Sequence, residues 1–177
     1  QYDEHFDYGG VVPEIASRAH LERLPKLTED VLQDIGLTLK DMNGIAAAVG
    51  PGLVGGLLMG STYAKTLAMA AEKPFVAVNH LAGHALSPLL AEDAPEFPYL
   101  LLLVSGGHCQ LVQVNGVNAY TTLGSTLDDA AGECLDKTAR ILGLNPPNGA
   151  ELEKLAAGAD PFAIELPMPK VDGLDFS

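Results

Sequence analysis

Cysteine and basic side chains are scarce in this sequence of 177 residues. The two cysteines, Cys109 and Cys134, fall within a predicted strand and a predicted helix, and no signal-peptide pattern is visible, so a reducing cytoplasm is the expected setting. Only 10 Lys and Arg residues stand against 23 Asp and Glu residues, which gives a formal charge of −13. Because phosphate contacts need clustered Lys and Arg, the chain is not expected to hold nucleic acid without other segments or partners.

A long uninterrupted apolar run is also missing. The most apolar stretch, residues 52–71, carries Ser61, Thr62, Tyr63 and Lys65 at its centre. Since a membrane-spanning helix needs roughly 20 apolar residues in succession, no membrane segment is expected. The 19 glycines and 12 prolines are scattered, which excludes a collagen-like or low-complexity chain.

The hydrophobic content is 47%, which is enough to bury a continuous core. Helical patterns alternate with short buried strands, and one antiparallel hairpin occurs among them, so the sequence predicts a mixed α/β fold. Strands are expected at residues 45–49, 75–78, 99–104, 110–114 and 121–123. Helices are expected at 11–36 with a kink or break at Pro25, after Gly50-Pro51-Gly52, at 80–90 behind an N-cap at Asn79, at 127–142 with Asp128 and Asp129 in the first turn, and at 151–157.

His80 and His84 form an H-x-x-x-H pair within a predicted helix. Residues four apart lie on one face of a helix with their Cβ atoms about 5–6 Å apart, so both imidazoles can reach one cation. A carboxylate or water must complete such a site. The alternative is two helical histidines that make ordinary hydrogen bonds, and the spacing alone does not decide between the two. A metalloprotease of the zincin type is not indicated, because Leu81 stands where its general-base Glu would be.

The turn Ser105-Gly106-Gly107-His108 joins two predicted strands. Without Cβ atoms, its glycines leave backbone N–H groups accessible to a phosphate or a carboxylate. Ordinary hairpins also use Gly-Gly, so a purely structural turn is the alternative.

Three further positions are ambiguous from the residues alone. Asp136 lies four residues before Arg140, which suits either an exposed ion pair or a carboxylate that bonds the hydroxyls of a ribose. Gly149, after a Pro-Pro-Asn turn, suits either a turn or a ligand contact. Gly50-Pro51-Gly52 precedes a helix N-terminus, a common anion site, but it lacks the Lys and Ser or Thr of a P-loop. The helix that follows is expected to use its glycines for close packing, at Gly55, Gly56 and Gly60.

Five blocks follow one another along the chain in a fixed order: Tyr8-Gly-Gly-Val-Val-Pro-Glu-Ile-Ala-Ser-Arg18, Gly50-Pro-Gly-Leu-Val-Gly-Gly56, Asn79-His-Leu-Ala-Gly-His84, Leu103-Val-Ser-Gly-Gly-His108, and Asp128-Asp-Ala-Ala-Gly-Glu133 with Asp136-Lys-Thr138. This succession resembles the TsaD family, also called YgjD or Gcp. The resemblance extends from about Tyr8 to Ser177 and is far more specific than any single motif.

The resemblance implies an actin- and hexokinase-like (ASKHA) fold, with residues 1–144 as an N-terminal lobe that is incomplete at its start and 145–177 as the beginning of the next region. The implied activity is transfer of a threonylcarbamoyl group from threonylcarbamoyl-adenylate to N6 of the adenosine beside the anticodon, in tRNAs that read codons beginning with A. TsaB-like and TsaE-like proteins are the implied partners.

The resemblance also implies the residues of the site. His80 and His84 are expected to bind one iron or zinc ion, with a third protein ligand absent from this chain. No general base is identified. The adenylate is expected to contact Leu103, Val104, Ser105, Gly106, Gly107, Asp136 and Gly149.

Family chains are longer, so the first strands with their acidic turn and the second lobe are expected to be missing here. Family members usually carry Gly-Gly-Pro where this chain has Asn148-Gly149-Ala150. One alternative is a non-catalytic, TsaB-like partner subunit, although such partners lack the histidine pair. Another is a folded fragment without activity of its own, which is expected to bind metal weakly and to expose a sheet edge.

Overall fold

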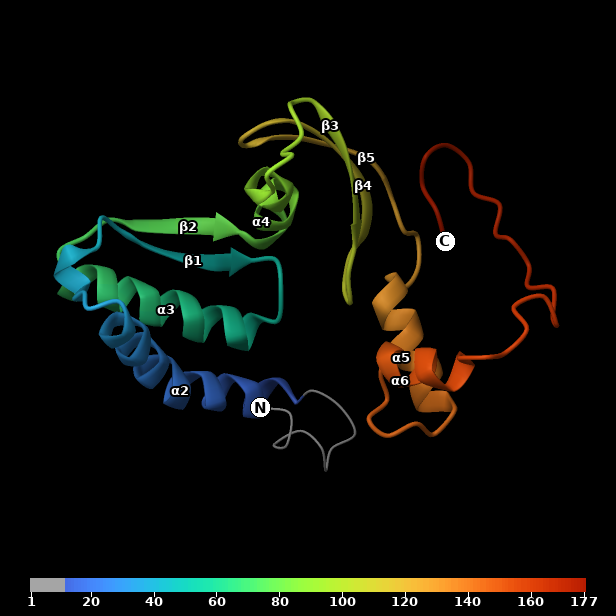
Figure 1. The fold of residues 1–177 in the computed structure, drawn as a ribbon, viewed down its shortest axis with the longest axis horizontal. Coiled ribbons are helices and arrows are strands. Elements are labelled where there is room, and N and C mark those ends of the chain that lie inside the picture. The colour runs from blue at the N-terminus through green and yellow to red at the C-terminus, as the bar shows by residue number, and fades with distance from the viewer. Residues whose placement is uncertain (1–11) are drawn as a thin grey trace. The chain divides into compact units, whose positions relative to one another are not determined.

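A computed structural model describes residues 12–177, so the predicted helix start at Val11 and part of the Tyr8–Arg18 block lie outside the described residues. The chain divides into two compact units, the first ending at Gly83 and the second running from His84 to Ser177 (Figure 1). Helices and strands alternate in the order expected, which confirms the mixed α/β class. The boundary expected at residues 144/145 concerns the lobes of a longer protein and stays a prediction.

The described part of the first unit consists of a parallel strand pair with helices packed on one side of it. Strand β1 (Ile45–Gly50) pairs with β2 (Phe75–Asn79), with Ile45 opposite Phe75. Helix α3 (Val54–Ala70) packs on this sheet and α2 (Pro13–Asp34) packs on α3, while the short 3₁₀ helix η1 (Leu39–Asp41) leads into β1 (Figure 1).

Helix α2 begins at Pro13, as expected for a proline in the first helical turn. It continues through Pro25 to Asp34, so of the predicted kink or break at Pro25 the break is wrong and the kink stays a prediction. A proline removes one backbone hydrogen bond of the helix. The remaining bonds and the packing of α2 on α3 keep the helix in one piece.

Close packing between α2 and α3 explains one of the three helical glycines. A Cβ added at Gly55 would overlap the hydroxyl of Ser17 on α2, which confirms the packing role predicted for this residue. At Gly56 and Gly60 an added Cβ would meet no atom within 4 Å, so packing among the described residues does not require glycine there.

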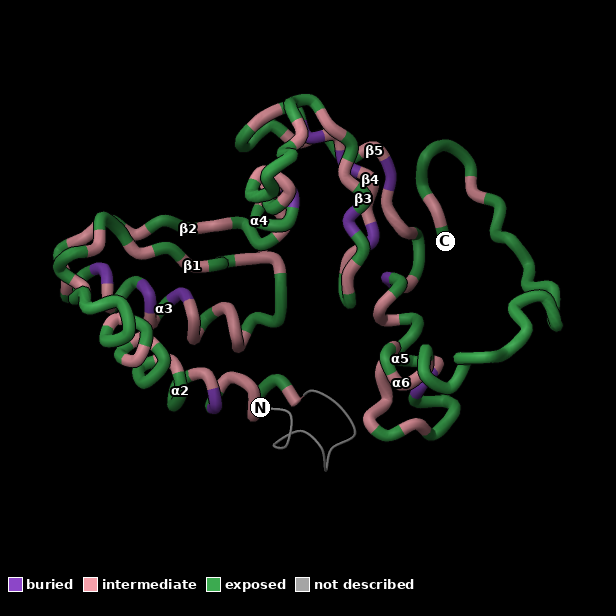
Figure 2. The backbone as a smooth tube through the Cα atoms, viewed as in Figure 1, coloured by how far each residue is buried: buried purple, intermediate pink, exposed green. Residues whose placement is uncertain are grey.

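The sheet of the first unit is covered on one face by α3, whose buried side chains are small: Ser61, Ala64 and Ala68. Both strands contain exposed stretches (Figure 2). Ala46 and its partner Val76 are among the exposed residues, and Val76 is 52% exposed. Parallel strands as apolar as these are normally covered on both faces. Within the described residues, the second face of this sheet and the outer edge of β1 therefore remain open.

The second unit contains an antiparallel sheet of three strands in the order β3-β4-β5. Helix α4 (His80–Leu86) spans the division between the units, and the 3₁₀ helix η2 (Ser87–Leu90) follows it. The sheet comprises β3 (Tyr99–Val104), β4 (Cys109–Gly116) and β5 (Ala119–Ser125), and the helices α5 (Ala131–Ile141) and α6 (Gly149–Ala156) come next and pack together.

The core of the second unit lies between α4 and the sheet. Val114 is fully buried and contacts Ala85 of α4 and Val112, with Tyr99, Leu101 and Tyr120 packed around them. The hydroxyl of Tyr99 donates a hydrogen bond to the carbonyl of Ala85. Side chains alternate along a strand, so this packing leaves the opposite face of β3 exposed at Leu100, Leu102 and Val104.

Helix α5 begins at Ala131, four residues later than predicted, so Asp128 and Asp129 precede the helix instead of lying in its first turn. The hydroxyl of Thr126 bonds the carboxylate of Asp128 and the carbonyl of Asp129, at 2.9 and 3.1 Å, and this local turn replaces the helical bonds.

The end of the described chain pairs with the strand that leads into this turn. The N–H of Leu127 donates to Phe176 and the N–H of Phe176 donates to Ser125, at 2.9 and 3.2 Å. Segment Leu174–Ser177 thus lies beside the end of β5 and holds the entry to α5. No helix within residues 12–177 has the length and hydropathy needed to cross a bilayer.

Candidate functional site

The histidine pair lies at the start of α4. The Asn79 side chain accepts hydrogen bonds from the N–H groups of Leu81 and Ala82, at 2.8 and 3.2 Å, which confirms the predicted N-cap. His80 and His84 are the first and fifth residues of this helix, so they share one face, and both are exposed. The predicted position of the two histidines on one exposed helix face is therefore confirmed, whereas their role as metal ligands stays a prediction.

The described residues contain no group of three or more His, Cys, Asp and Glu side chains placed to hold a metal ion. His80 and His84 thus fit part of a coordination sphere, and further ligands must complete it. That the pair faces the Leu103–Gly107 segment also stays a prediction.

The turn between β3 and β4 has the hairpin form predicted for it. The N–H of Ser105 donates to the carbonyl of His108 at 2.8 Å, and the Ser105 hydroxyl oxygen accepts from the N–H groups of His108 and Gly107 at 3.1 and 3.4 Å. The Ser105 side chain therefore fixes the backbone of the turn from inside.

The two glycines of this turn are not required by its geometry. Two-residue hairpin loops usually need a positive φ, but neither Gly106 nor Gly107 has one. A Cβ added at either position would meet no atom within 4 Å. Neither backbone conformation nor packing within the described residues requires glycine at these two positions. Close approach of a ligand to the backbone is one reason for glycine at such exposed positions, and this role stays a prediction.

The residues that flank the glycines differ in what they can offer a ligand. Leu103 is only 6% exposed, so its side chain is buried and is not accessible to a ligand. Val104 lies on the opposite face of β3 from Leu103 and is 55% exposed. A ligand at this turn would therefore meet backbone groups of residues 103–107 more than the leucine side chain.

The same turn lies against the N-terminus of α5. The N–H of Gly132 donates to the carbonyl of Ser105 at 3.3 Å, and the N–H of Ala131 donates to the sulfur of Cys109 at 3.2 Å. The helix has no side-chain N-cap. The hairpin thus satisfies N–H groups that the first turn of a helix otherwise leaves without a partner.

Asp136 lies on α5 four residues after Gly132 and hence on the same face, one helical turn further along. Its carboxylate accepts a hydrogen bond from the N–H of Gly149 at 3.0 Å, and Gly149 is the first residue of α6. Asn148 caps this helix by accepting from the N–H of Glu151 at 2.9 Å, which explains why α6 begins two residues earlier than predicted. Asp136 is exposed, so its carboxylate remains accessible to a ligand.

Helix α5 therefore connects the predicted substrate-binding residues of the second unit. The Ser105–Gly107 turn meets its N-terminus, and Asp136 with Gly149 lies one turn beyond. This arrangement places the exposed backbone of Gly106 and Gly107, which a phosphate can approach closely, one helical turn from a carboxylate suited to ribose hydroxyls.

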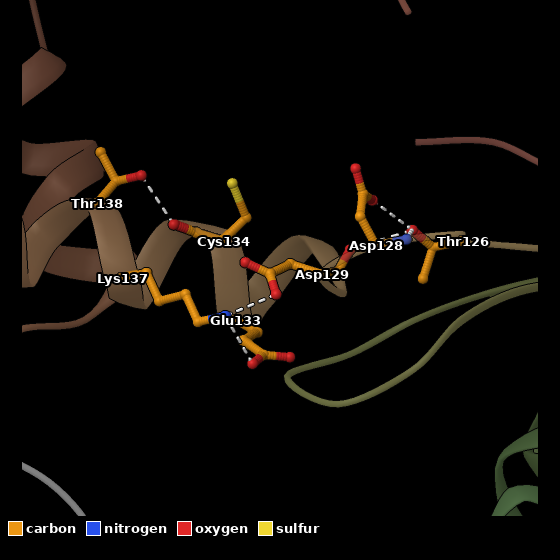
Figure 3. Close-up of polar contacts among 7 residues, drawn as sticks. All are labelled: Thr126, Asp128, Asp129, Glu133, Cys134, Lys137 and Thr138. Carbon is orange, nitrogen blue, oxygen red and sulfur yellow. Dashed lines mark hydrogen bonds and ion pairs between the residues drawn. The ribbon is translucent and has the colours of Figure 1, made fainter. Parts of the chain in front are cut away.

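Sequence patterns do not predict the whole charged cluster that Asp129, Glu133 and Lys137 form at the start of α5. The ammonium of Lys137 lies 2.6 Å from the Asp129 carboxylate and 3.0 Å from that of Glu133 (Figure 3). The hydrogen bond to Asp129, and then that to Glu133, raise the pKa of Lys137. The spacing of Glu133 and Lys137 is a signal for one of these pairs, whereas the bond to Asp129 depends on the turn before the helix. Because the pairs are largely exposed, they fix side-chain positions more than they stabilise the fold.

The whole chain matches one protein family. The match is to TsaD, described as tRNA N6-adenosine threonylcarbamoyltransferase, over residues 1–177. A protein of that name from Sphingopyxis alaskensis is 59% identical over 171 residues, which cover 97% of this chain and 50% of the relative. Relatives from Novosphingobium aromaticivorans and Brucella canis are 56% identical over 171 residues and 55% identical over 179.

These alignments cover 97% and 100% of this chain but 49% and 50% of those two relatives. The chain thus spans about half the length of the curated relatives it matches. Its sequence blocks, its α/β fold and the match along its entire length agree, and the chain belongs to the TsaD family of tRNA N6-adenosine threonylcarbamoyltransferases.

Proposed function

We propose that the protein to which this chain belongs transfers the threonylcarbamoyl group from threonylcarbamoyl-adenylate to N6 of the adenosine beside the anticodon, in tRNAs that read codons beginning with A. Family membership supports the reaction class, since the relatives named above carry that activity in their names. Their names do not favour the alternative of a TsaB-like partner subunit.

The observation that carries the proposal is the arrangement along α5. The proposed adenylate site places the phosphate at the Ser105–Gly107 turn and the ribose at Asp136, whose position is supported by its hydrogen bond to Gly149. Close approach of the leaving phosphate to the exposed Gly106–Gly107 backbone would place its developing negative charge beside the fixed dipoles of the turn. Binding the nucleotide one helical turn away fixes its orientation, which lowers the entropic part of the barrier.

His80 and His84 are proposed as two ligands of one iron or zinc ion, with the third protein ligand supplied from outside this chain. Their exposure and their shared face on α4 support this role. When bound, such an ion supplies Lewis-acid polarisation of a carbamoyl or phosphate oxygen. The two imidazoles contribute by fixing where that charge sits relative to α4.

tRNA binding is proposed to depend on other parts of the protein and on TsaB-like and TsaE-like partners. The support is the charge of this chain, which at −13 repels a polyanion. A cytoplasmic location is proposed with it, because the proposed tRNA substrate is found there.

The test uses the full-length protein with its TsaB-like and TsaE-like partners, synthetic threonylcarbamoyl-adenylate and an unmodified tRNA transcript. Mass spectrometry of the digested tRNA should show the threonylcarbamoyl adenosine at the expected position. Replacing His80 and His84 by Ala together should abolish the product and reduce the metal content. The matched control is His20→Ala on α2, whose ring bonds the Ala16 carbonyl at 2.6 Å, and it should retain activity.

A folded full-length protein that forms no modified adenosine in the complete mixture would contradict the proposed reaction. Full activity and unchanged metal content in the double histidine variant would contradict the metal site alone, and the reaction class would stand.

A further inference from the structure

We propose that Gly132 is a positioning residue, which sets the place of the Ser105–Gly107 turn at the N-terminus of α5 and thereby governs adenylate binding. The inference rests on the proposed function of this turn. It differs from the substrate contacts in kind, because Gly132 acts through the turn and not on the ligand.

The first argument is steric. A Cβ added at Gly132 would lie 2.7 Å from the Cα of Gly106, 3.0 Å from the carbonyl oxygen of Ser105 and 3.1 Å from the N of Gly106. All three atoms belong to the backbone of the turn, so no side-chain rotation can relieve the overlap. Only a hydrogen at this position of α5 lets the turn come so close.

The second argument is the hydrogen bonding at the same contact. The N–H of Gly132 donates to the carbonyl of Ser105 at 3.3 Å, and the N–H of Ala131 donates to the Cys109 sulfur at 3.2 Å, on the other side of the turn. The start of α5 is therefore hydrogen-bonded to the hairpin on both sides of the turn, at Ser105 and at Cys109. A side chain at position 132 would push the N–H of residue 132 and the Ser105 carbonyl apart. The bond from Ala131 to Cys109 would remain and would hold only one side of the turn.

The third argument is that α5 gains nothing as a helix from this glycine. Glycine is a weaker helix former than alanine, and Gly132 has no left-handed φ that would require it. The residue is explained by the close contact with the turn. The Ser105–Gly107 turn itself contains two glycines, Gly106 and Gly107, at which an added Cβ would meet no atom within 4 Å.

The size of the displacement follows from the contact distance. Moving the Gly106 Cα from 2.7 Å to an ordinary contact of 3.4 Å from the new Cβ requires a shift of about 0.7 Å. Misplacement of a binding group by about 1 Å can lower a rate by about 100-fold. We therefore expect Gly132→Ala to raise the KM for the adenylate by about 10- to 100-fold and to leave the KM for tRNA unchanged.

The experiment compares three alanine variants of the full-length protein. Gly132→Ala introduces the overlap with the turn. Gly60→Ala makes the same change in α3, where the new Cβ meets open space. The third variant, Cys109→Ala, removes the sulfur that accepts from Ala131 without adding atoms, and it covers the case in which Gly132→Ala does not fold.

Two readouts are needed, namely hydrogen exchange of the peptide spanning residues 103–108 and the separate KM values for adenylate and tRNA. We expect Gly132→Ala to speed exchange in this peptide and to raise only the adenylate KM, and Cys109→Ala to do the same to a smaller extent. Gly60→Ala should change neither readout.

Unchanged exchange and unchanged KM in the Gly132→Ala and Cys109→Ala variants would overturn the proposal, as would an equal rise in the adenylate KM for Gly60→Ala. Faster exchange with an unchanged adenylate KM would confirm that Gly132 positions the turn but would refute the proposed role of the turn in binding. The two failures are therefore distinguishable.

Discussion

Asp136 is the residue at which structural and chemical roles can be separated most cleanly. One carboxylate oxygen accepts from Gly149 at 3.0 Å, in an exposed place where α5 meets α6. Asp136→Asn keeps an oxygen acceptor for this bond but loses the charge, whereas Asp136→Ala loses both. A hydrogen bond to a charged group is worth about 1.5–3 kcal/mol, which corresponds to a factor of about 10–150 in affinity.

We therefore predict that Asp136→Asn in the full-length protein weakens adenylate binding by about 10–150-fold and changes the free energy of unfolding by less than about 0.5 kcal/mol. Asp136→Ala should weaken binding equally and lower stability by about 1 kcal/mol, because the Gly149 N–H turns to water at an exposed site. Calorimetric titration with a non-reactive adenylate analogue and urea denaturation measure the two quantities. Asp93→Asn, an exposed carboxylate in the loop before β3, is the control. Wild-type affinity in both Asp136 variants would refute the ribose assignment.

Four further outcomes are expected. Val114→Ala should lower the free energy of unfolding by about 2–3 kcal/mol in urea denaturation, from two lost buried methyl groups and a partial cavity, whereas Val117→Ala, at 61% exposure, should change it by less than about 0.5 kcal/mol. Hydrogen bonds from Ser177 and Thr126 lower the pKa of Asp128 below its ordinary value of 3.8. The stabilisation that the ionised Asp128 carboxylate provides is therefore complete above pH 3.8 and is lost as the pH falls through the lower pKa of the folded state. Hydrogen exchange should show segment Leu174–Ser177 loosening only in that acid range, and Asp128→Asn should remove the dependence. The 177-residue chain alone should bind zinc or iron weakly, so tight stoichiometric binding in calorimetry would contradict the shared metal site. The same chain should self-associate through the open edge of β1, and sedimentation as a concentration-independent monomer would count against that.

The strands were predictable because short apolar runs between turn residues leave little choice of structure. The strand predictions at 45–49, 75–78 and 99–104 agree with β1, β2 and β3 to within a residue. The N-cap at Asn79 was predictable for the same local reason, since its side chain bonds N–H groups two and three residues away.

Features that depend on distant contacts could not be predicted. The start of α5 moves to Ala131 because the residues before it bond one another and a segment some fifty positions later in the chain, Leu174–Ser177. The bond between Asp136 and Gly149 joins two helices across an irregular loop, so spacing gave no sign of it. The contact of Gly132 with the turn likewise depends on how a hairpin packs on a helix.

The most direct test of the adenylate site is a titration of full-length protein with the non-reactive adenylate analogue. The protein carries isotope-labelled glycine, and nuclear magnetic resonance monitors the glycine amide signals during the titration. The account predicts that the amide signals of Gly106, Gly107 and Gly149 shift together as one saturable event, while that of Gly36 at the end of α2 does not move. Saturation of the protein with no shift at those three glycines would contradict it.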